Sequence, residues 1–275
     1  MERPQFKFVK ILDEGANNEI VNRIFLQFSD ILDRNIIELP KEQVDKLKEC
    51  LFDCMKDILK AEDSKKAYIL LEDQVIKQII SGDGIKYQTH AISFDDPTER
   101  LTKHFEDFLI WCVIAIRKIV KIAIIIFSKS FKGIKDVKNY LKTIFGDESI
   151  EWKMIEDDSN WVKELYDLRG KVEHDELNIE RFDIELSPSG KPIIIIPAIA
   201  KTKVPLRSYL TVTMENCYTF CEDVIAILLN TKAPEIAHIV QIPESVRPKY
   251  RGFKYILDLK GEYKEKFFKT IKKKE

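Results

Sequence analysis

Apolar residues recur every three or four positions through most of this sequence, and that spacing places them on one face of an α-helix. Proline and glycine separate the periodic segments, because proline cannot continue a helix and glycine tolerates the backbone conformations that follow one. The pattern predicts amphipathic helices over residues 18–37, 41–58, 63–80, 133–145, 161–176 and 206–230.

A further helix, predicted over residues 98–128, is the expected centre of the fold. Asp96 and Pro97 precede it as a capping residue and a favourable first residue, and Glu99 can reach back to the cap amide. At about 1.5 Å per residue, a helix of this length spans on the order of 45 Å. Its second half is apolar on almost every side, so neighbouring helices must cover it.

The clearest β signal lies between residues 182 and 196. Polar and apolar residues alternate over 182–186, a Ser-Pro-Ser-Gly turn follows, and 192–196 is an apolar run, which together predict a β-hairpin. We therefore expect a mainly α fold, a multi-helix bundle around a long central helix with this hairpin as an insertion. Weaker patterns predict a strand at 6–12, a loop at 81–92, a strand at 251–259 and a basic helix at 263–274.

These patterns predict a helical bundle domain over residues 1–232, with an irregular basic C-terminal extension, residues 233–275, packed on it. The hydrophobic content of 45% and charged content of 33% are typical of a soluble globular protein. The formal net charge is −1, so no overall field selects nucleic acid or membrane. The charge is segregated, however, with eight basic residues against one acidic residue over 117–142 and eight acidic against three basic over 156–176.

The cysteines and the most apolar stretch of the sequence indicate in which compartment of the cell the protein is expected. Five cysteines without regular spacing indicate free thiols in a reducing compartment. The most apolar stretch, 108–127, carries Arg117, Lys118 and Lys121 in its middle, where a bilayer span would not place them. With no signal peptide evident either, we expect a cytoplasmic protein without membrane association.

The helix predicted over residues 161–176 carries the one residue pair for which a specific reaction can be written. Arg169 and His174 lie beside its apolar stripe. A histidine titrates near neutrality and can exchange a proton with a ribose 2′-hydroxyl or with the leaving oxygen. An arginine can bind phosphate oxygens with two hydrogen bonds and stabilise the charge that builds up in the transition state. The pair therefore indicates metal-independent RNA cleavage.

A structural interpretation of the same residues remains open. Arg169 and Glu173 are four residues apart and can form an ordinary ion pair, while a cation at His174 is favoured near the helix C-terminus. Residues five apart on a regular helix diverge by about 140°. The pair would therefore converge in one chain only if the helix ends or distorts near Gly170.

The run Leu-Arg-Gly-Lys-Val-Glu-His at 168–174 resembles the Arg-x4–6-His motif of HEPN proteins. These all-helical domains include many metal-independent ribonucleases of prokaryotic defence and toxin systems. The resemblance implies that Arg169 and His174 form a catalytic pair in a composite site made by two protomers of a homodimer. It covers this motif and a compatible run of helices over about 94–230. The family usually has Asn, Asp or His directly after the arginine, whereas this chain has Gly170.

Other candidate groups have simpler explanations. Cys50/Cys54 and Cys217/Cys221 are each four apart and four thiolates can hold zinc, but these residues lie on apolar stripes where cysteine packs as a small hydrophobe. We therefore expect no metal, and no motif indicates a nucleotide cofactor. The three histidines without ligand-spaced partners are interpreted as structural or surface residues: His90, His104 and His238.

Two hypotheses follow from the sequence. The first is a HEPN-like RNA endonuclease acting as a homodimer, with RNA contacted by four lysines: Lys118, Lys135, Lys138 and Lys142. The second is a non-catalytic helical binding or scaffold protein. Lysines that converge on the Arg/His motif favour the first hypothesis, whereas burial of the motif within one protomer, with Glu173 holding Arg169, favours the second.

Overall fold

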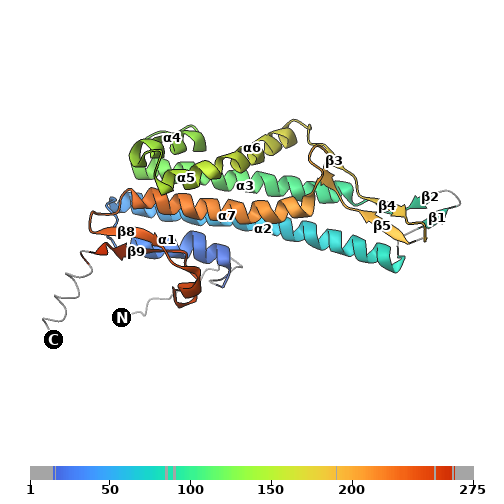
Figure 1. Ribbon diagram of the computed structural model, residues 1–275, viewed down its shortest axis with the longest axis horizontal. Helices are drawn as coiled ribbons and strands as arrows, with labels where there is room; N and C mark the ends of the chain where they lie inside the picture. The colour runs from blue at the N-terminus through green and yellow to red at the C-terminus, as the bar shows by residue number, and fades with distance from the viewer. Residues whose placement is uncertain are drawn as a thin grey trace, which may run out of the picture.

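The computed structural model describes residues 15, 17–83, 86–88, 91–189, 191–250, 252–261 and 263. It is mainly α-helical, as predicted, and forms an elongated bundle with small antiparallel strand pairs (Figure 1). The helices are η1 (Val21–Leu26, a π-helix), α1 (Gln27–Asp33), α2 (Lys41–Ser81), α3 (Thr98–Phe127), α4 (Ile134–Phe145), α5 (Ile150–Asp157), α6 (Ser159–Glu173), α7 (Leu206–Asn230) and η2 (Glu244–Tyr250, a 3-10 helix).

The prediction of two separate helices over 41–58 and 63–80 is wrong, because α2 is one helix of 41 residues. The junction, Leu-Lys-Ala-Glu at 59–62, contains good helix formers and neither proline nor glycine, so nothing local interrupts it. At about 1.5 Å per residue α2 is on the order of 60 Å long. It ends at the predicted breaker, where Gly82 takes a left-handed φ of 77°.

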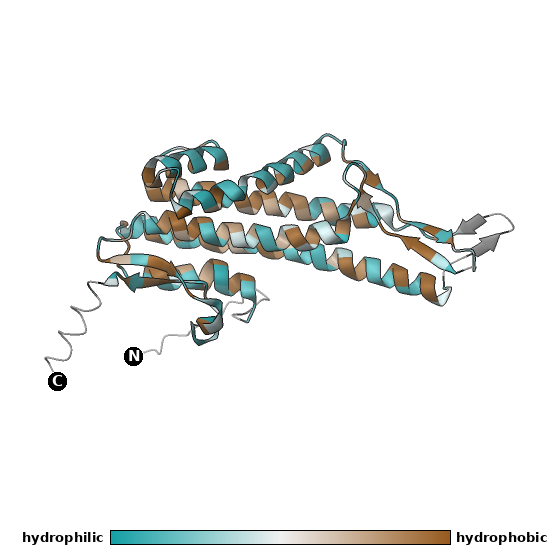
Figure 2. Ribbon diagram, viewed as in Figure 1, coloured by the Kyte–Doolittle hydropathy of each residue, from teal (hydrophilic) through white to brown (hydrophobic). Residues whose placement is uncertain are grey.

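Helix α3 lies at the centre of the bundle, packed against α2, α7, α6 and α4 (Figure 1). The Asp96 carboxylate accepts the Thr98 backbone N–H at 2.9 Å, as predicted for a capping residue, but the helix begins at Thr98 and Pro97 is the residue just before it. The side chains that pack between the long helices are fully buried, among them Phe105, Phe108, Leu109, Ile116 and Ile119. Figure 2 shows the apolar residues of α2, α3 and α7 mixed with polar ones along each helix, as amphipathic helices require.

The strands form small antiparallel sheets at the two ends of the bundle (Figure 1). The predicted hairpin is confirmed: β4 (Asp183–Leu186) pairs with β5 (Pro192–Ile195), with Ile184 opposite Ile194. Short strands also occur where a loop was predicted, β1 (Lys86–Gln88) and β2 (Ala91–Ser93). The remaining strands are β3 (Ile179–Glu180), β6 (Ala198–Ile199), β7 (Val204–Pro205), β8 (Ala237–Gln241) and β9 (Tyr255–Leu259).

The C-terminal portion, predicted to be irregular, contains a β-ribbon in which β8 and β9 pair from Ala237↔Leu259 to Gln241↔Tyr255. The strand predicted within 251–259 is β9, and β8 is its unpredicted partner. Three predictions concern residues outside the described part of the chain: the strand at 6–12, the role of His90, and the helix at 263–274, of which only Tyr263 is described. None of the described helices combines the length and the apolar character that spanning a bilayer requires.

Candidate functional site

Helix α6 positions both residues of the Arg/His motif. Leu165 and Leu168 are buried against the bundle. The Trp161 ring meets Phe220 of α7 edge-on, with ring centroids 5.6 Å apart, and the Trp161 Nε1–H donates to Asp158 at 2.6 Å. These contacts fix how the helix is rotated about its axis. They therefore determine the sides of α6 from which the Arg169 and His174 side chains project.

Arg169 forms an ion pair with Glu173, four residues further along α6. This is the pairing expected from the structural interpretation of the motif. The Arg169 side chain keeps 20% of its accessible surface and the Glu173 side chain keeps 50%. The pair is therefore partly open to solvent, where an ion pair contributes little to stability and another anion can displace the carboxylate.

His174 closes α6 and its side chain is exposed. Its backbone N–H donates to the Gly170 carbonyl at 3.2 Å, but α6 ends at Glu173 and His174 has non-helical dihedrals, φ −104° and ψ 11°. A Cβ added at Gly170 would meet no atom within 4 Å, and the φ of Gly170 is not in the left-handed region. Gly170 therefore does not distort α6, and residues five apart on a helix that is regular up to Glu173 diverge by about 140°.

A second arginine reaches α6 from the central helix. Arg117 of α3 lies close enough to Tyr166, three residues before Arg169, for its positive charge to act on the phenol. Burial raises the pKa of Tyr166, although the Arg117 guanidinium opposes that shift. Arg117 itself is exposed. No sequence pattern singles it out, because it is one of eight basic residues in a run and Tyr166 lies on another helix.

Acidic side chains lie near the C-terminal end of the motif. The pKa of Glu106 on α3 is raised by burial and then by Asp107 and by Asp175, the residue after His174. Asp175 therefore lies close enough to α3 to repel Glu106. This end of the α3–α6 pair is acidic, which disfavours the approach of a polyanion from that side.

The four lysines predicted to bind nucleic acid do not gather around the motif. Lys118 turns toward α2, where its Nζ lies 3.2 Å from Asp53 and 3.8 Å from Asp57. Lys138 pairs with Glu156 at 2.6 Å, and Lys142 lies 3.6 Å from Asp147. Lys135 is exposed on α4, which lies at the end of the bundle where α6 begins rather than where it ends (Figure 1).

The cysteine pairs predicted on two helices come together in the core. The Cys217 thiol donates to the Cys112 carbonyl at 4.0 Å and the Cys54 thiol to the Ala115 carbonyl at 3.7 Å, both on α3. Cys221 lies close to Cys54 and Cys217. All five cysteines are free and buried, and burial raises the pKa of Cys50 to about 12. Within the described part of the chain, no group of three or more potential ligands is placed to hold a metal ion. The cysteines therefore pack in the core as small hydrophobic side chains.

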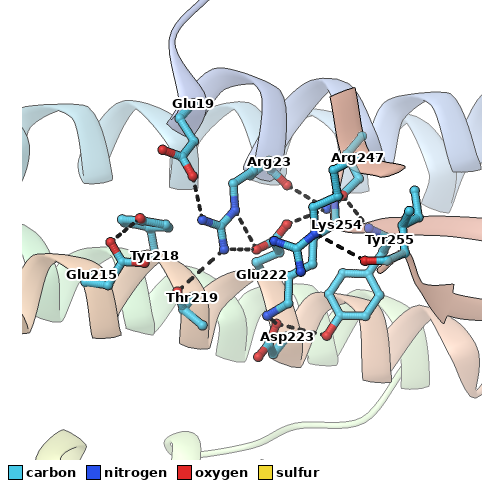
Figure 3. A network of polar contacts seen from close by, with 12 residues as sticks. Glu19, Arg23, Glu215, Tyr218, Thr219, Glu222, Asp223, Arg247, Lys254 and Tyr255 are labelled. Carbon is cyan, nitrogen blue, oxygen red and sulfur yellow. Dashed lines mark hydrogen bonds and ion pairs between the residues drawn. The ribbon is translucent and has the colours of Figure 1, made fainter. Parts of the chain in front are cut away.

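A buried polar network joins η1 and α1 to α7 and β9 (Figure 3). The Arg23 Nε donates to Glu222 at 2.7 Å, and Gln27 donates to the other oxygen of Glu222 at 3.0 Å. Glu222 is fully buried, so these donors replace the water it loses. No sequence pattern predicted this ion pair, because Arg23 and Glu222 are 199 residues apart in the chain.

The same network holds the C-terminal ribbon. The Gln27 carbonyl oxygen accepts the backbone N–H groups of both Lys254 and Tyr255 at 2.7 Å. Lys254 and the Tyr255 hydroxyl both reach Asp223 on α7 (Figure 3). Because each of these donors and acceptors is satisfied inside the protein, we interpret the network as a structural clamp and not as a site for chemistry.

Two clefts lie away from the Arg/His motif. One, of about 320 Å³, is lined by residues just before η1, by α2 and by α7, and includes Glu19 and Tyr218. The other, of about 260 Å³, lies between α6 and α7 and includes Trp161 and Tyr209. Neither is lined by Arg169 or His174.

Comparison with known proteins adds no relative: no protein-family model, no curated protein and no solved structure matches the chain. The resemblance to HEPN proteins therefore rests on the motif at 168–174 and on the compatible run of helices around it.

Proposed function

We propose that this protein is a metal-independent RNA endonuclease that acts as a homodimer in the cytoplasm, with its site at the C-terminal end of α6. The observation that carries the proposal is the exposure of the motif. His174 is open to solvent at the helix end, and Arg169 is held only by the exposed carboxylate of Glu173 among the contacts described for it. Both groups can therefore be reached by a phosphate.

The roles follow from the chemistry of the two side chains. His174 exchanges a proton with the 2′-hydroxyl or the leaving 5′-oxygen of the scissile linkage. Arg169 leaves Glu173, binds the non-bridging phosphate oxygens and stabilises the charge that develops in the transition state. No metal ion is required for either role.

The geometry of α6 is the reason for proposing two protomers. Residues five apart on a helix diverge by about 140°, and α6 is undistorted at Gly170 and ends only at Glu173. Two copies packed with their α6 ends together can place the arginine of one beside the histidine of the other. The composite site is then a property of the dimer.

A second candidate, a non-catalytic helical scaffold, is favoured by two observations. Arg169 has the intrahelical partner that a purely structural role requires. The neighbouring surface is acidic around Glu106 and Asp175, and three of the four lysines predicted to bind RNA are engaged by carboxylates elsewhere. In this case Arg169 and His174 contribute solubility and a few tenths of a kcal/mol of helix stability.

The test is cleavage of labelled single-stranded RNA in the presence of EDTA. We expect the wild type to cleave and Arg169→Ala and His174→Ala each to be inactive, while all three stay folded by circular dichroism. Arg34→Ala is the matched control, since Arg34 is exposed and pairs with Asp30 on its own helix. Cleavage that is unchanged in both motif variants, or absent from a folded wild type, would favour the scaffold.

Mixing the two inactive variants tests the composite site. A heterodimer of Arg169→Ala with His174→Ala contains one arginine and one histidine from different chains, so a shared site regains part of the wild-type activity. If each chain used its own pair, the mixture would stay inactive.

A further inference from the structure

The cleft of about 260 Å³ between α6 and α7 has aromatic walls that the bundle holds in place. Trp161 lines it from α6 and Tyr209 from α7. The Trp161 ring stands at 88° to that of Phe220, and the Tyr209 ring at 68° to that of Phe105, each pair with its centroids 5.6 Å apart. Both phenylalanines are buried, so the walls of the cleft are fixed before any ligand arrives.

The charge of the cleft comes from one carboxylate. Glu164 follows Trp161 by three residues and is therefore its neighbour on the surface of α6. It is exposed, and it forms no ion pair within the part of the chain that the structure describes. The described residues that complete the lining are uncharged: Val204, Ser208, Val212, Thr213 and Asn216. A ligand can therefore supply the missing positive charge.

Aromatic walls beside a single carboxylate suit an organic cation. An aromatic ring attracts a positive charge to its face. The apolar surroundings favour an ammonium group that carries methyl groups over a strongly hydrated one. Glu164 repels an anion such as a phosphate. The volume of about 260 Å³ is below the roughly 300–1,000 Å³ of pockets for drug-sized molecules, so the ligand is small.

We propose that this cleft binds a small free organic cation with a methylated ammonium group, of the choline type. Trp161 and Tyr209 supply the aromatic surface, and Glu164 supplies the counter-charge. Neither Arg169 nor His174 lines the cleft, so the inference does not depend on the proposed nuclease activity.

The experiment uses choline and tetramethylammonium as probes, each titrated against the full chain. The matched control ligand is the uncharged analogue of choline in which carbon replaces nitrogen. Saturation-transfer NMR on the methyl protons of each probe measures binding. We expect both cations to bind with a Kd on the order of 1 mM. The uncharged analogue should bind about tenfold more weakly, because it has no charge for the rings and the carboxylate to attract.

Three variants connect binding to this cleft. Glu164→Gln removes the counter-charge and should raise Kd roughly two- to fivefold, as for an exposed ion pair. Val212→Lys introduces a cation at the cleft and should raise Kd roughly tenfold. Val212 is 59% exposed, so the lysine leaves the core undisturbed. Glu49→Gln, at an exposed glutamate of α2 outside the cleft, is the matched control and should leave Kd unchanged. Circular dichroism confirms that each variant is folded.

Binding that weakens in Glu164→Gln and Val212→Lys but not in Glu49→Gln would support the site. Three results would overturn it: no saturable binding of either cation up to about 100 mM, equal binding of the uncharged analogue, or a Kd unchanged by Val212→Lys. A peptide with a trimethylated lysine that binds far more tightly than choline would also overturn the proposal of a free ligand, because it would assign the cation to a protein partner. RNA cleavage is measured separately, so its presence or absence does not affect these outcomes.

Discussion

At the scale of single residues, Glu173 determines how available Arg169 is to an anion. The two side chains pair within one helix and both keep some exposure, so their attraction is screened by water. In a nuclease this carboxylate competes with the substrate phosphate for the arginine. In a scaffold it is an ordinary surface ion pair.

Glu173→Gln separates these two cases. For a nuclease we expect tighter RNA binding, with Kd lowered roughly two- to fivefold. The reason is that Arg169 no longer has to break its ion pair with Glu173 before it binds the phosphate. The free energy of unfolding should change by no more than about 0.5 kcal/mol, as for other intrahelical pairs. The measurements are RNA anisotropy and urea unfolding; a Kd equal to that of the wild type would contradict a competing role for Glu173.

At the scale of elements, one buried ion pair connects the first helical segment to the last long helix. Glu222 on α7 is fully buried and its carboxylate accepts two N–H groups of Arg23. Arg23 is 8% exposed and Gln27 is fully buried, so water cannot replace a missing partner easily. The register of η1 and α1 against α7 therefore depends on a few polar atoms as well as on apolar contacts.

Replacing Glu222 by Gln should be strongly destabilising, because it leaves the Arg23 charge buried without its main counter-charge. A loss of about 3–5 kcal/mol is expected for breaking one side of a buried pair. Asp30→Asn removes the exposed partner of Arg34 and should cost about 0–1 kcal/mol. Urea unfolding of both variants provides the comparison, and equal losses would show that the buried clamp contributes no more than a surface pair.

At the scale of the whole molecule, the cysteine cluster reports on the packing of three long helices at once. Cys54, Cys112, Cys217 and Cys221 are fully inaccessible, and Cys50 is 8% exposed. We expect a thiol reagent to modify none of the five cysteines in the native protein and all five after unfolding, with rates that follow global opening. Rapid modification of any of them under native conditions would show that the bundle opens locally there.

Local patterns in the sequence were sufficient for most of the helices and for the β4–β5 hairpin, because apolar spacing and turn residues act over a few positions; the short helix α5 was not predicted. The continuity of α2 was missed, since the apolar stripe is weak around Lys60 although the residues there favour helix. The Arg169–Glu173 pair was foreseeable from its spacing of four. The proximity of Arg117 to Tyr166 could not be predicted, because it depends on how α3 and α6 lie against each other.

The amide side chain of Gln27 has a further consequence for the assembly of this protein with itself. The N–H of Tyr255 is the first donor on the side of β9 that does not pair with β8, and an unpaired strand edge is where another chain can add a strand. Gln27 accepts this N–H with its side-chain oxygen, and both residues are buried. The residue that holds the ribbon against the bundle thus also makes this donor unavailable to a strand of another chain.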